Sequence, residues 1–368
     1  MILLSISACG FPALERADDG GMGGNVDSPP DAQQCFGSIV KVCFANNAAL
    51  PTTNPLPQDA TIQIDTDSDP LCNAHDNDQK ANYCVIAGNA VILASTQSIR
   101  GYGSKPLVLL ATRNMDIEGT VDVSSNRNPD PIIARGAGAN PAVCTGGVAP
   151  TGSGGGFGGS FGGKGGAGET VIGGGGGIGG TPADPLTSLP AVLRGGCSGS
   201  AGGNTGGGAA GIGGGAVALV ASQISLNGKV NASGGGGKGG AANQVGGGGG
   251  GAGGMIILDA DPTKIGGTGL VFANGGGGGQ GGSPGGGHDG DDGGESAAPA
   301  TAATGGAGTG GKDGGSGGTG SFGTSLVGRI GSGSQNQGGG GGGGGGAGFV
   351  HAPTLNPANV APPSKDPT

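Results

Sequence analysis

The chain of 368 residues contains 99 Gly and 23 Pro, no Trp, and 3% aromatic residues. Because glycine loses the most backbone entropy on folding and buries no side chain, a conventional hydrophobic core cannot stabilise the whole of such a chain. The net charge of −9 argues against nucleic-acid binding, which needs clustered Lys and Arg. Unbroken glycine runs such as 246–251 exclude the Gly-X-Y repeat of collagen.

The first residues resemble a bacterial lipoprotein signal. Ile6-Ser7-Ala8-Cys9 has the small residues that precede an acylated cysteine in such signals. The apolar stretch before Cys9 is about eight residues long and lacks the basic start of a full secretory signal, so we interpret residues 1–9 as a truncated signal. A chance cysteine in a short apolar segment is the alternative. Residues 10–34, rich in Asp, Gly, Ser and Pro, are typical of a flexible tether.

This signal predicts a protein of the cell envelope that is lipid-anchored through Cys9. Gly10, in place of an Asp after the cysteine, favours the outer membrane or the extracellular surface. No later stretch has about 18 consecutive apolar residues, so we expect no transmembrane helix. The predicted partners are the membrane, through the lipid anchor, and a surface glycan or protein ligand.

Six further cysteines follow Cys9. An even number in an exported chain predicts disulfide bonds. Of the fifteen connectivities that six cysteines allow, we predict pairing in sequence order. The predicted pairs are Cys35–Cys43, Cys72–Cys84 and Cys144–Cys197. Zinc binding is the alternative, and the lack of a Cys-X-X-Cys motif argues against it.

Glycine content changes sharply near residue 145. Residues 1–145 contain 12 of the 99 glycines, residues 146–349 contain the other 87, and residues 350–368 contain none. We therefore predict a disulfide-bonded strand region at 35–145 and a glycine-rich region at 146–349. The remaining residues, 350–368, are expected to form an extended tail.

An apolar strand followed by an alternating strand recurs along the chain. The copies are 107–111 with 115–123, 217–221 with 224–232, and 255–259 with 265–274. In each copy we expect the first strand to be buried on both faces and the second on one. This repetition predicts an all-β fold with little or no α-helix, in which the strands stack as an irregular β-helix or β-solenoid.

Six glycine-rich runs interrupt the strand units. They lie at 152–180, 195–215, 234–254, 275–294, 305–320 and 338–348. Polyglycine can form an extended helix with three residues per turn, and such helices lie close enough to exchange backbone hydrogen bonds. We expect most runs to be ordered insertions of this polyglycine II type. Disordered loops are the alternative.

Acidic residues cluster at two places. Asp65, Asp67 and Asp69 alternate along the chain and Asp76 follows, which is similar to a calcium-binding EF-hand loop except that Pro70 replaces the glycine of its sharp turn. We therefore consider that these four aspartates bind calcium in a loop whose geometry differs from that of an EF-hand. The alternative is an acidic turn that is exposed to solvent and binds no metal. The second cluster, at 288–295, misses the spacing of calcium-binding β-roll repeats. No other cofactor is predicted.

Evidence for catalysis is weak. A β-helix polysaccharide lyase would place charged side chains along one strand face, and the residues that could do so are Arg113, Asp116, Glu118 and Asp122. The alternative is the ordinary solvent side of a half-buried strand. The three histidines, His75, His288 and His351, have no nucleophile motif beside them. We therefore predict that the protein is not an enzyme.

Several segments resemble a group of uncharacterised glycine-rich lipoproteins of myxobacteria. They are Cys84-Val-Ile-Ala-Gly, residues 100–112, 119–125 and 155–166, Arg194-Gly-Gly-Cys, and Phe272-Ala-Asn followed by glycines. The resemblance implies a surface lipoprotein and brings no catalytic residues. The composition is also similar to that of the mycobacterial PE-PGRS proteins, but the chain does not carry their helical N-terminal domain.

Taken together, these patterns predict a non-enzymatic cell-surface lipoprotein that is a structural or adhesive module. Its glycine-rich scaffold would present residues such as Phe157, Phe161 and Asn204 at the tips of loops, because a scaffold with few side chains leaves recognition to its turns. A carbohydrate-active β-helix enzyme is the first alternative. An ice-binding protein, which would need a flat and regular face lined by Thr or Gly, is the second.

Overall fold

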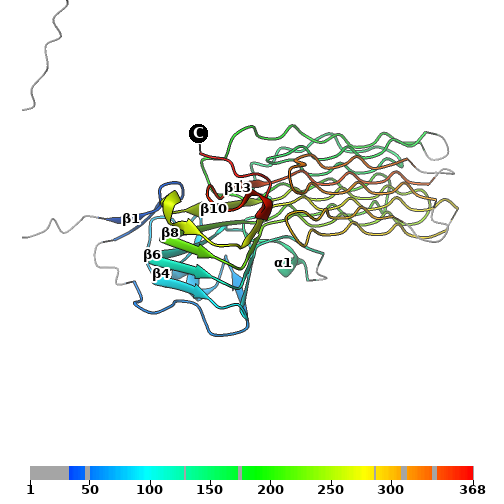
Figure 1. Ribbon diagram of the computed structural model, residues 1–368. Helices are drawn as coiled ribbons and strands as arrows, with labels where there is room; N and C mark the ends of the chain where they lie inside the picture. The colour runs from blue at the N-terminus through cyan, green and yellow to red at the C-terminus, as the bar shows by residue number, and fades with distance from the viewer. Residues whose placement is uncertain are drawn as a thin grey trace, which may run out of the picture.

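The computed structural model describes residues 33–45, 50–127, 130–172, 176–285, 287–307, 313–333 and 338–367. The strands gather at one end of the molecule, here called the strand body. The glycine runs extend from it as a long bundle of nearly straight segments, the glycine bundle (Figure 1). The N-terminal strand β1 (Gln34–Phe36) lies at the end of the strand body that faces away from the bundle.

The first sheet consists of parallel strands in the order β13-β10-β8-β6-β4, with β11 paired to β8. Its strands are β4 (Cys84–Leu93), β6 (Leu107–Ile117), β8 (Ala216–Leu226), β10 (Met255–Asp259), β11 (Ile265–Gly266) and β13 (Phe349–His351). The sequence repeats pair in register, with Leu109 opposite Leu219 and Met115 opposite Ile224. Each copy therefore places a side chain beside its equivalent in the next copy.

The second sheet is also parallel, in the order β14-β12-β9-β7-β5-β3. Its strands are β3 (Thr61–Asp65), β5 (Ser98–Tyr102), β7 (Thr120–Asp122), β9 (Lys229–Asn231), β12 (Leu270–Phe272) and β14 (Val360–Ala361). Residues 350–368, predicted as an extended tail, thus contribute to β13 and supply β14, so they take part in both sheets.

The remaining elements are short. Strands β1 and β2 (Val42–Phe44) form an antiparallel hairpin. The helical turns are η1 (Pro70–Asn73), α1 (Pro131–Ala134), η2 (Pro262–Lys264) and η3 (Pro357–Asn359). Each begins with proline, and the Asp or Asn before it accepts a hydrogen bond from a backbone N–H two residues further on. The side chain caps the turn while proline fixes the first φ angle, which explains why all four begin at Asp-Pro or Asn-Pro.

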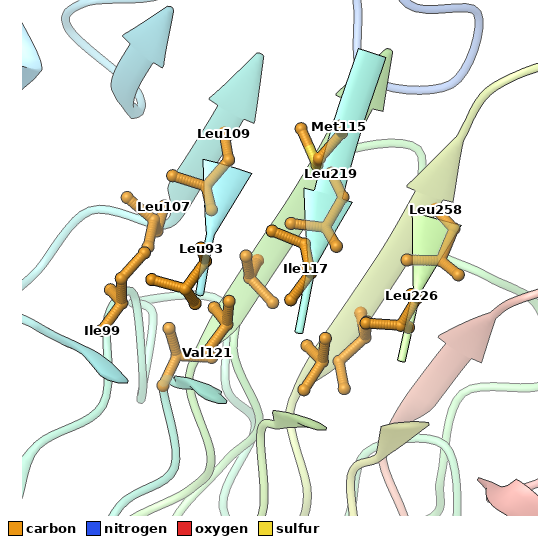
Figure 2. Close-up of a cluster of buried hydrophobic side chains, with 14 of the residues drawn as sticks. Leu93, Ile99, Leu107, Leu109, Met115, Ile117, Val121, Leu219, Leu226 and Leu258 are labelled. Carbon is orange, nitrogen blue, oxygen red and sulfur yellow. The ribbon is translucent and has the colours of Figure 1, made fainter. Parts of the chain in front are cut away.

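An inner core lies between the two sheets. Side chains alternate along a strand, so Leu107 and Leu109 of β6 point into the inner core with Ile99 and Val121 of the second sheet (Figure 2). The intervening Val108 and Leu110 belong to an outer core on the other face of the first sheet. The apolar segment of β6 is therefore buried on both faces, as its composition predicted.

The predicted β-helix or solenoid is wrong. The strand units form two parallel six-stranded sheets, and the described residues make no closed solenoid. The connections explain the difference. After β7 the chain runs through residues 123–215, most of them in the glycine bundle, before it re-enters the first sheet at β8. The path thus leaves the strand body between copies of the repeat, where a solenoid would turn directly into the next coil.

The glycine runs are hydrogen-bonded to one another at intervals of three residues. Gly156 N donates to Gly247 O and Gly159 N to Gly250 O, both at 2.8 Å. Residues 247, 250 and 253 donate in turn to 340, 343 and 346 at 2.9 to 3.0 Å. A three-residue repeat is that of the extended polyproline II helix, which has no internal hydrogen bonds. Each run therefore satisfies its backbone groups through its neighbours, without a hydrophobic core.

Position in the bundle explains which runs are pure glycine. A Cβ on Gly248, Gly249 or Gly250 would lie about 2 Å from a carbonyl oxygen of three different neighbouring runs, those of Ala209, Phe157 and Gly276. The part of a run that is enclosed in this way, here residues 246–251, admits no side chain. By contrast, residues 162–168 read Gly-Gly-Lys-Gly-Gly-Ala-Gly, with Lys164 and Ala167 half-buried at the edge of the bundle. Runs at the surface thus admit a side chain at every third residue.

Candidate functional site

The end of the glycine bundle away from the strands is formed by turns between runs. We call residues 204–206, 241–244 and 283–285 the distal turns. Their left-handed backbone is taken up by residues that tolerate it best, such as Asn204 at φ 63° and Asn243 at φ 70°. The turns are joined, because the N–H groups of Asn243 and Gln244 both donate to Ser283 O, at 2.9 and 3.2 Å. Asn204 Nδ2 donates to Ser153 Oγ at 3.1 Å.

Exposed side chains of the distal turns are polar and uncharged. Asn204, Thr205 and Asn243 are exposed, and they offer amide and hydroxyl groups to solvent. The ordered bundle sets their separation from the strand body. Residues 245–254 alone, at about 3.1 Å per residue, span about 30 Å. The described distal turns therefore form a polar surface held well away from the N-terminal hairpin.

Two residues predicted to be displayed at loop tips lie elsewhere. Phe157 is 7% exposed and Phe161 is 1% exposed. Phe161 lies at the end of its run that meets the strand body, where its ring contacts Phe349 edge-on with 5.0 Å between centroids. The prediction is wrong for both because apolar rings fill the outer core or the gaps between runs. Of the three residues predicted for display, Asn204 alone is exposed.

The cysteines form the three disulfides predicted from the sequence. Cys35–Cys43 closes the β1–β2 hairpin, Cys72–Cys84 joins η1 to β4, and Cys144–Cys197 joins two segments at the start of the glycine bundle. Pairing in sequence order is confirmed. Cys9, the predicted lipidation site, and the signal and most of the tether lie outside the described residues.

The four aspartates predicted for calcium have separate partners. Asp65 accepts a hydrogen bond from Asp67 N at 3.0 Å, and Asp69 caps η1 through Leu71 N at 2.9 Å. Asp67 accepts from Ser104 N at 2.8 Å, and Asp76 pairs with Lys80 at 2.5 Å. In the described part of the chain, no three acidic, His or Cys side chains are grouped so that they could hold a metal ion. Asp65, Asp67 and Asp69 thus stabilise the turn between β3 and η1, whereas Asp76 lies after η1.

The acidic cluster at 288–295 contacts the edge of the bundle. Arg127 Nη1 lies 2.9 Å from Asp292 and its Nε lies 3.5 Å from Glu295. Asp292 also accepts from Gly239 N at 2.9 Å, and Asp289 accepts from Ala242 N at 2.8 Å. At the surface of the bundle, carboxylates thus accept the hydrogen bonds that the carbonyl groups of a neighbouring run accept inside it.

The charged residues proposed for a lyase do not share one face. Met115 and Ile117 of β6 point into the inner core, so Asp116 between them points away from it on the first sheet. Asp122 lies on β7 of the second sheet, where it pairs with Arg100 at 3.4 Å. Asp116 and Asp122 therefore lie on opposite outer sides of the strand body. The histidines are also dispersed, since His288 is exposed at the distal end and His351 is buried in β13.

Asp259 is a structural residue that the sequence analysis missed. Its buried carboxylate accepts hydrogen bonds from the N–H groups of Ser38, Ile39 and Val40 at 2.7 to 3.0 Å, and from Ser38 Oγ at 2.7 Å. These contacts attach the hairpin to the first sheet. An acidic residue at the end of the otherwise apolar strand Met255–Asp259 is the signal that could have revealed it.

A groove of about 800 Å³ lies where the strand body meets the bundle. Its walls come from residues 81–83 before β4, residues 104–106 before β6, residues 138–143, and residues 186–194. Tyr83 lies buried in one wall, and burial raises the pKa of its phenol more than a hydrogen bond with the Leu193 backbone lowers it. No sequence motif marked this groove.

Arg194 at the groove is held on an aromatic ring. Its guanidinium carbon lies 4.6 Å from the centroid of Phe161, a cation–π contact. Partial burial lowers the pKa of this guanidinium from its ordinary value. Its Nη1 atom is buried and has no hydrogen-bond partner among the described residues. The guanidinium is thus fixed in orientation while part of its hydrogen-bonding capacity stays unused.

Comparisons with protein-family models, curated proteins and solved structures found no match to this chain. Among the described residues, no helix has the length and apolar character needed to span a membrane.

Proposed function

We propose that the protein is a non-enzymatic cell-surface lipoprotein, anchored through Cys9, that displays its distal turns to a ligand outside the cell. The observation that carries the proposal is the arrangement of the molecule along its long axis. The N-terminal hairpin lies at one end of the molecule, and the distal turns form the opposite end, at the far end of the glycine bundle (Figure 1). A chain anchored at its N-terminal side would point these turns away from the membrane.

A surface glycan is the ligand class that fits the distal turns best. Asn204, Thr205 and Asn243 offer hydrogen-bond donors and acceptors for sugar hydroxyls. Their turns bring no exposed large apolar side chain, which a protein interface would use as an anchor. The ordered backbone of the runs reduces the entropy lost when the turns bind.

The test compares binding by the Cys9→Ser protein, purified without lipid, with that of a variant that also carries Asn204→Gly, Thr205→Ala and Asn243→Gly. Glycine keeps the left-handed backbone at positions 204 and 243, so the variant loses side chains and retains the turns. On a glycan array and on intact cells we expect saturable binding that this variant loses. Asn114→Ala, exposed on β6, is the matched control. Binding that survives the triple variant, or release of sugar fragments, would refute the proposal.

A further inference from the structure

We propose that the groove between the strand body and the glycine bundle binds an extended peptide segment of another protein, one that carries a carboxylate next to apolar side chains. This site is separate from the distal turns and does not depend on the function proposed for them. The proposal rests on the apolar walls of the groove, on its charge, and on the state of Arg194.

The walls expose apolar side chains that the fold leaves uncovered. Val143, Leu186 and Val192 are 65%, 40% and 58% exposed, and all three line this one groove. Pro141 and Pro190 line it as well. Large apolar side chains gathered at one exposed concave surface mark an interaction site, whereas single scattered ones do not.

The charge of the groove is opposite to that of the protein. The chain has 25 acidic and 16 basic residues, yet the described lining of the groove contains Lys105 and Arg194 and no acidic residue. Lys105 uses one N–H on Lys80 O at 3.0 Å, which leaves two donors of its ammonium group. A negatively charged partner is therefore complementary to this surface, although most of the molecule repels it.

Arg194 supplies the specific contact. The Phe161 ring covers one face of its guanidinium and Nη1 is enclosed, so the donors that a carboxylate can reach are those of the Nε–Nη2 edge. A carboxylate accepts two parallel hydrogen bonds from such an edge. It would also compensate the positive charge of a partly desolvated guanidinium.

The same walls disfavour a sugar as the occupant. Sugar rings stack on exposed aromatic faces, but Tyr83 is 9% exposed and Arg194 covers the ring of Phe161. Asn82 and Ser104 are the exposed uncharged polar side chains in the described lining, which is few for a ligand covered with hydroxyl groups. A peptide matches the apolar side chains and the two cations together.

The experiment is a selection from a random dodecapeptide library displayed on phage, with the full-length Cys9→Ser protein as the immobilised target. We expect enrichment of peptides in which Asp or Glu adjoins Leu, Ile or Val. Synthetic versions should bind Arg194→Gln about tenfold or more weakly than the unsubstituted protein, since a charge-assisted bidentate contact is lost. Arg194→Lys, which keeps the charge without the planar fork, should recover part of the affinity.

Two further variants separate binding from folding. Val192→Asp places a carboxylate in the groove at an exposed position and should abolish binding without a change in Tm. Arg113→Gln, exposed on β6, is the control and should bind normally. No enrichment over the bare support, enrichment of peptides without acidic residues, or unchanged binding by Val192→Asp would each overturn the proposal. Because the distal turns are intact in these variants, glycan binding reports on the proposed function separately.

Discussion

Replacement of Gly249 by alanine tests how the glycine bundle is held together. A Cβ at this position would lie 1.8 Å from Phe157 O, far inside van der Waals contact. The runs of Phe157 and Gly249 would have to separate, although Gly156 N donates to Gly247 O and Gly159 N donates to Gly250 O, both at 2.8 Å. The contacting atoms are backbone, so no side chain can rotate away.

The expected loss in the free energy of unfolding is about 3 kcal/mol. Two weakened hydrogen bonds cost about 1 kcal/mol each, and overpacking costs about 1–3 kcal/mol. Alanine offsets less than about 1 kcal/mol of this by restricting the unfolded chain. Gly146→Ala is the matched control, because nothing lies within 4 Å of a Cβ there. In this variant alanine acts only by restricting the unfolded chain. We therefore expect its free energy of unfolding to equal that of the parent protein or to exceed it by about 0.4–1 kcal/mol.

The assay is urea-induced unfolding followed by circular dichroism for the two variants and the parent protein. We expect the midpoint to fall for Gly249→Ala and to stay or rise for Gly146→Ala. If the two substitutions changed stability by the same amount, close contact between runs would not be what excludes side chains from the enclosed positions.

Three further predictions concern single contacts. Removal of the Cys144–Cys197 disulfide by paired serine substitutions, which opens a link across 53 residues, should lower the free energy of unfolding by about 4 kcal/mol in urea titrations. Asp259→Asn should weaken the hydrogen bonds that hold the N-terminal hairpin, by about 3 kcal/mol or more, and limited proteolysis should then cut near the hairpin first. Burial raises the pKa of Glu169 above its ordinary value, so the ionised form destabilises the fold above that pKa and stability is regained as the pH falls through it. Glu169→Gln should therefore raise Tm at pH 7 and leave it unchanged at a pH below the ordinary pKa.

Each of these predictions has a result that contradicts it. A disulfide variant as stable as the parent would mean that the link constrains little of the unfolded chain. An unchanged digestion pattern for Asp259→Asn would show that the hairpin is held by its apolar contacts. A Glu169→Gln variant that is less stable at pH 7 would mean that the carboxylate accepts hydrogen bonds that outweigh its burial.

Sequence reasoning worked where a pattern is local or repeats. Leu107 and Val217 begin equivalent apolar segments, and they pair directly because neighbouring copies place like side chains together. The disulfide partners follow sequence order, which loop closure favours because a short loop such as that of Cys35–Cys43 or Cys72–Cys84 costs less entropy than a long one. Burial of the apolar strand segments on both faces could be predicted because these segments contain no polar residues.

The errors came from long-range placement. The repeats were consistent with a solenoid, but nothing local in residues 123–215 shows that the chain leaves the strand body between copies. Phe161 lies among glycines in the sequence, and its burial depends on Phe349, which is distant along the chain. Asp259 and Arg194 likewise owe their roles to partners brought together by the fold; no motif indicates Arg194, and the acidic end of an apolar strand marks Asp259 without naming its partners.

The central claim is that hydrogen bonds between glycine runs order the bundle that carries the distal turns. Amide hydrogen exchange of the intact protein, measured by mass spectrometry over residues 245–254 and 338–348, tests it most directly. The amides of residues 246–254, 339, 340 and 342–348 donate to neighbouring segments at 2.7 to 3.2 Å, so we predict that they exchange as slowly as those in the buried strands of the first sheet. Exchange at the rate of an unstructured glycine peptide would contradict the account.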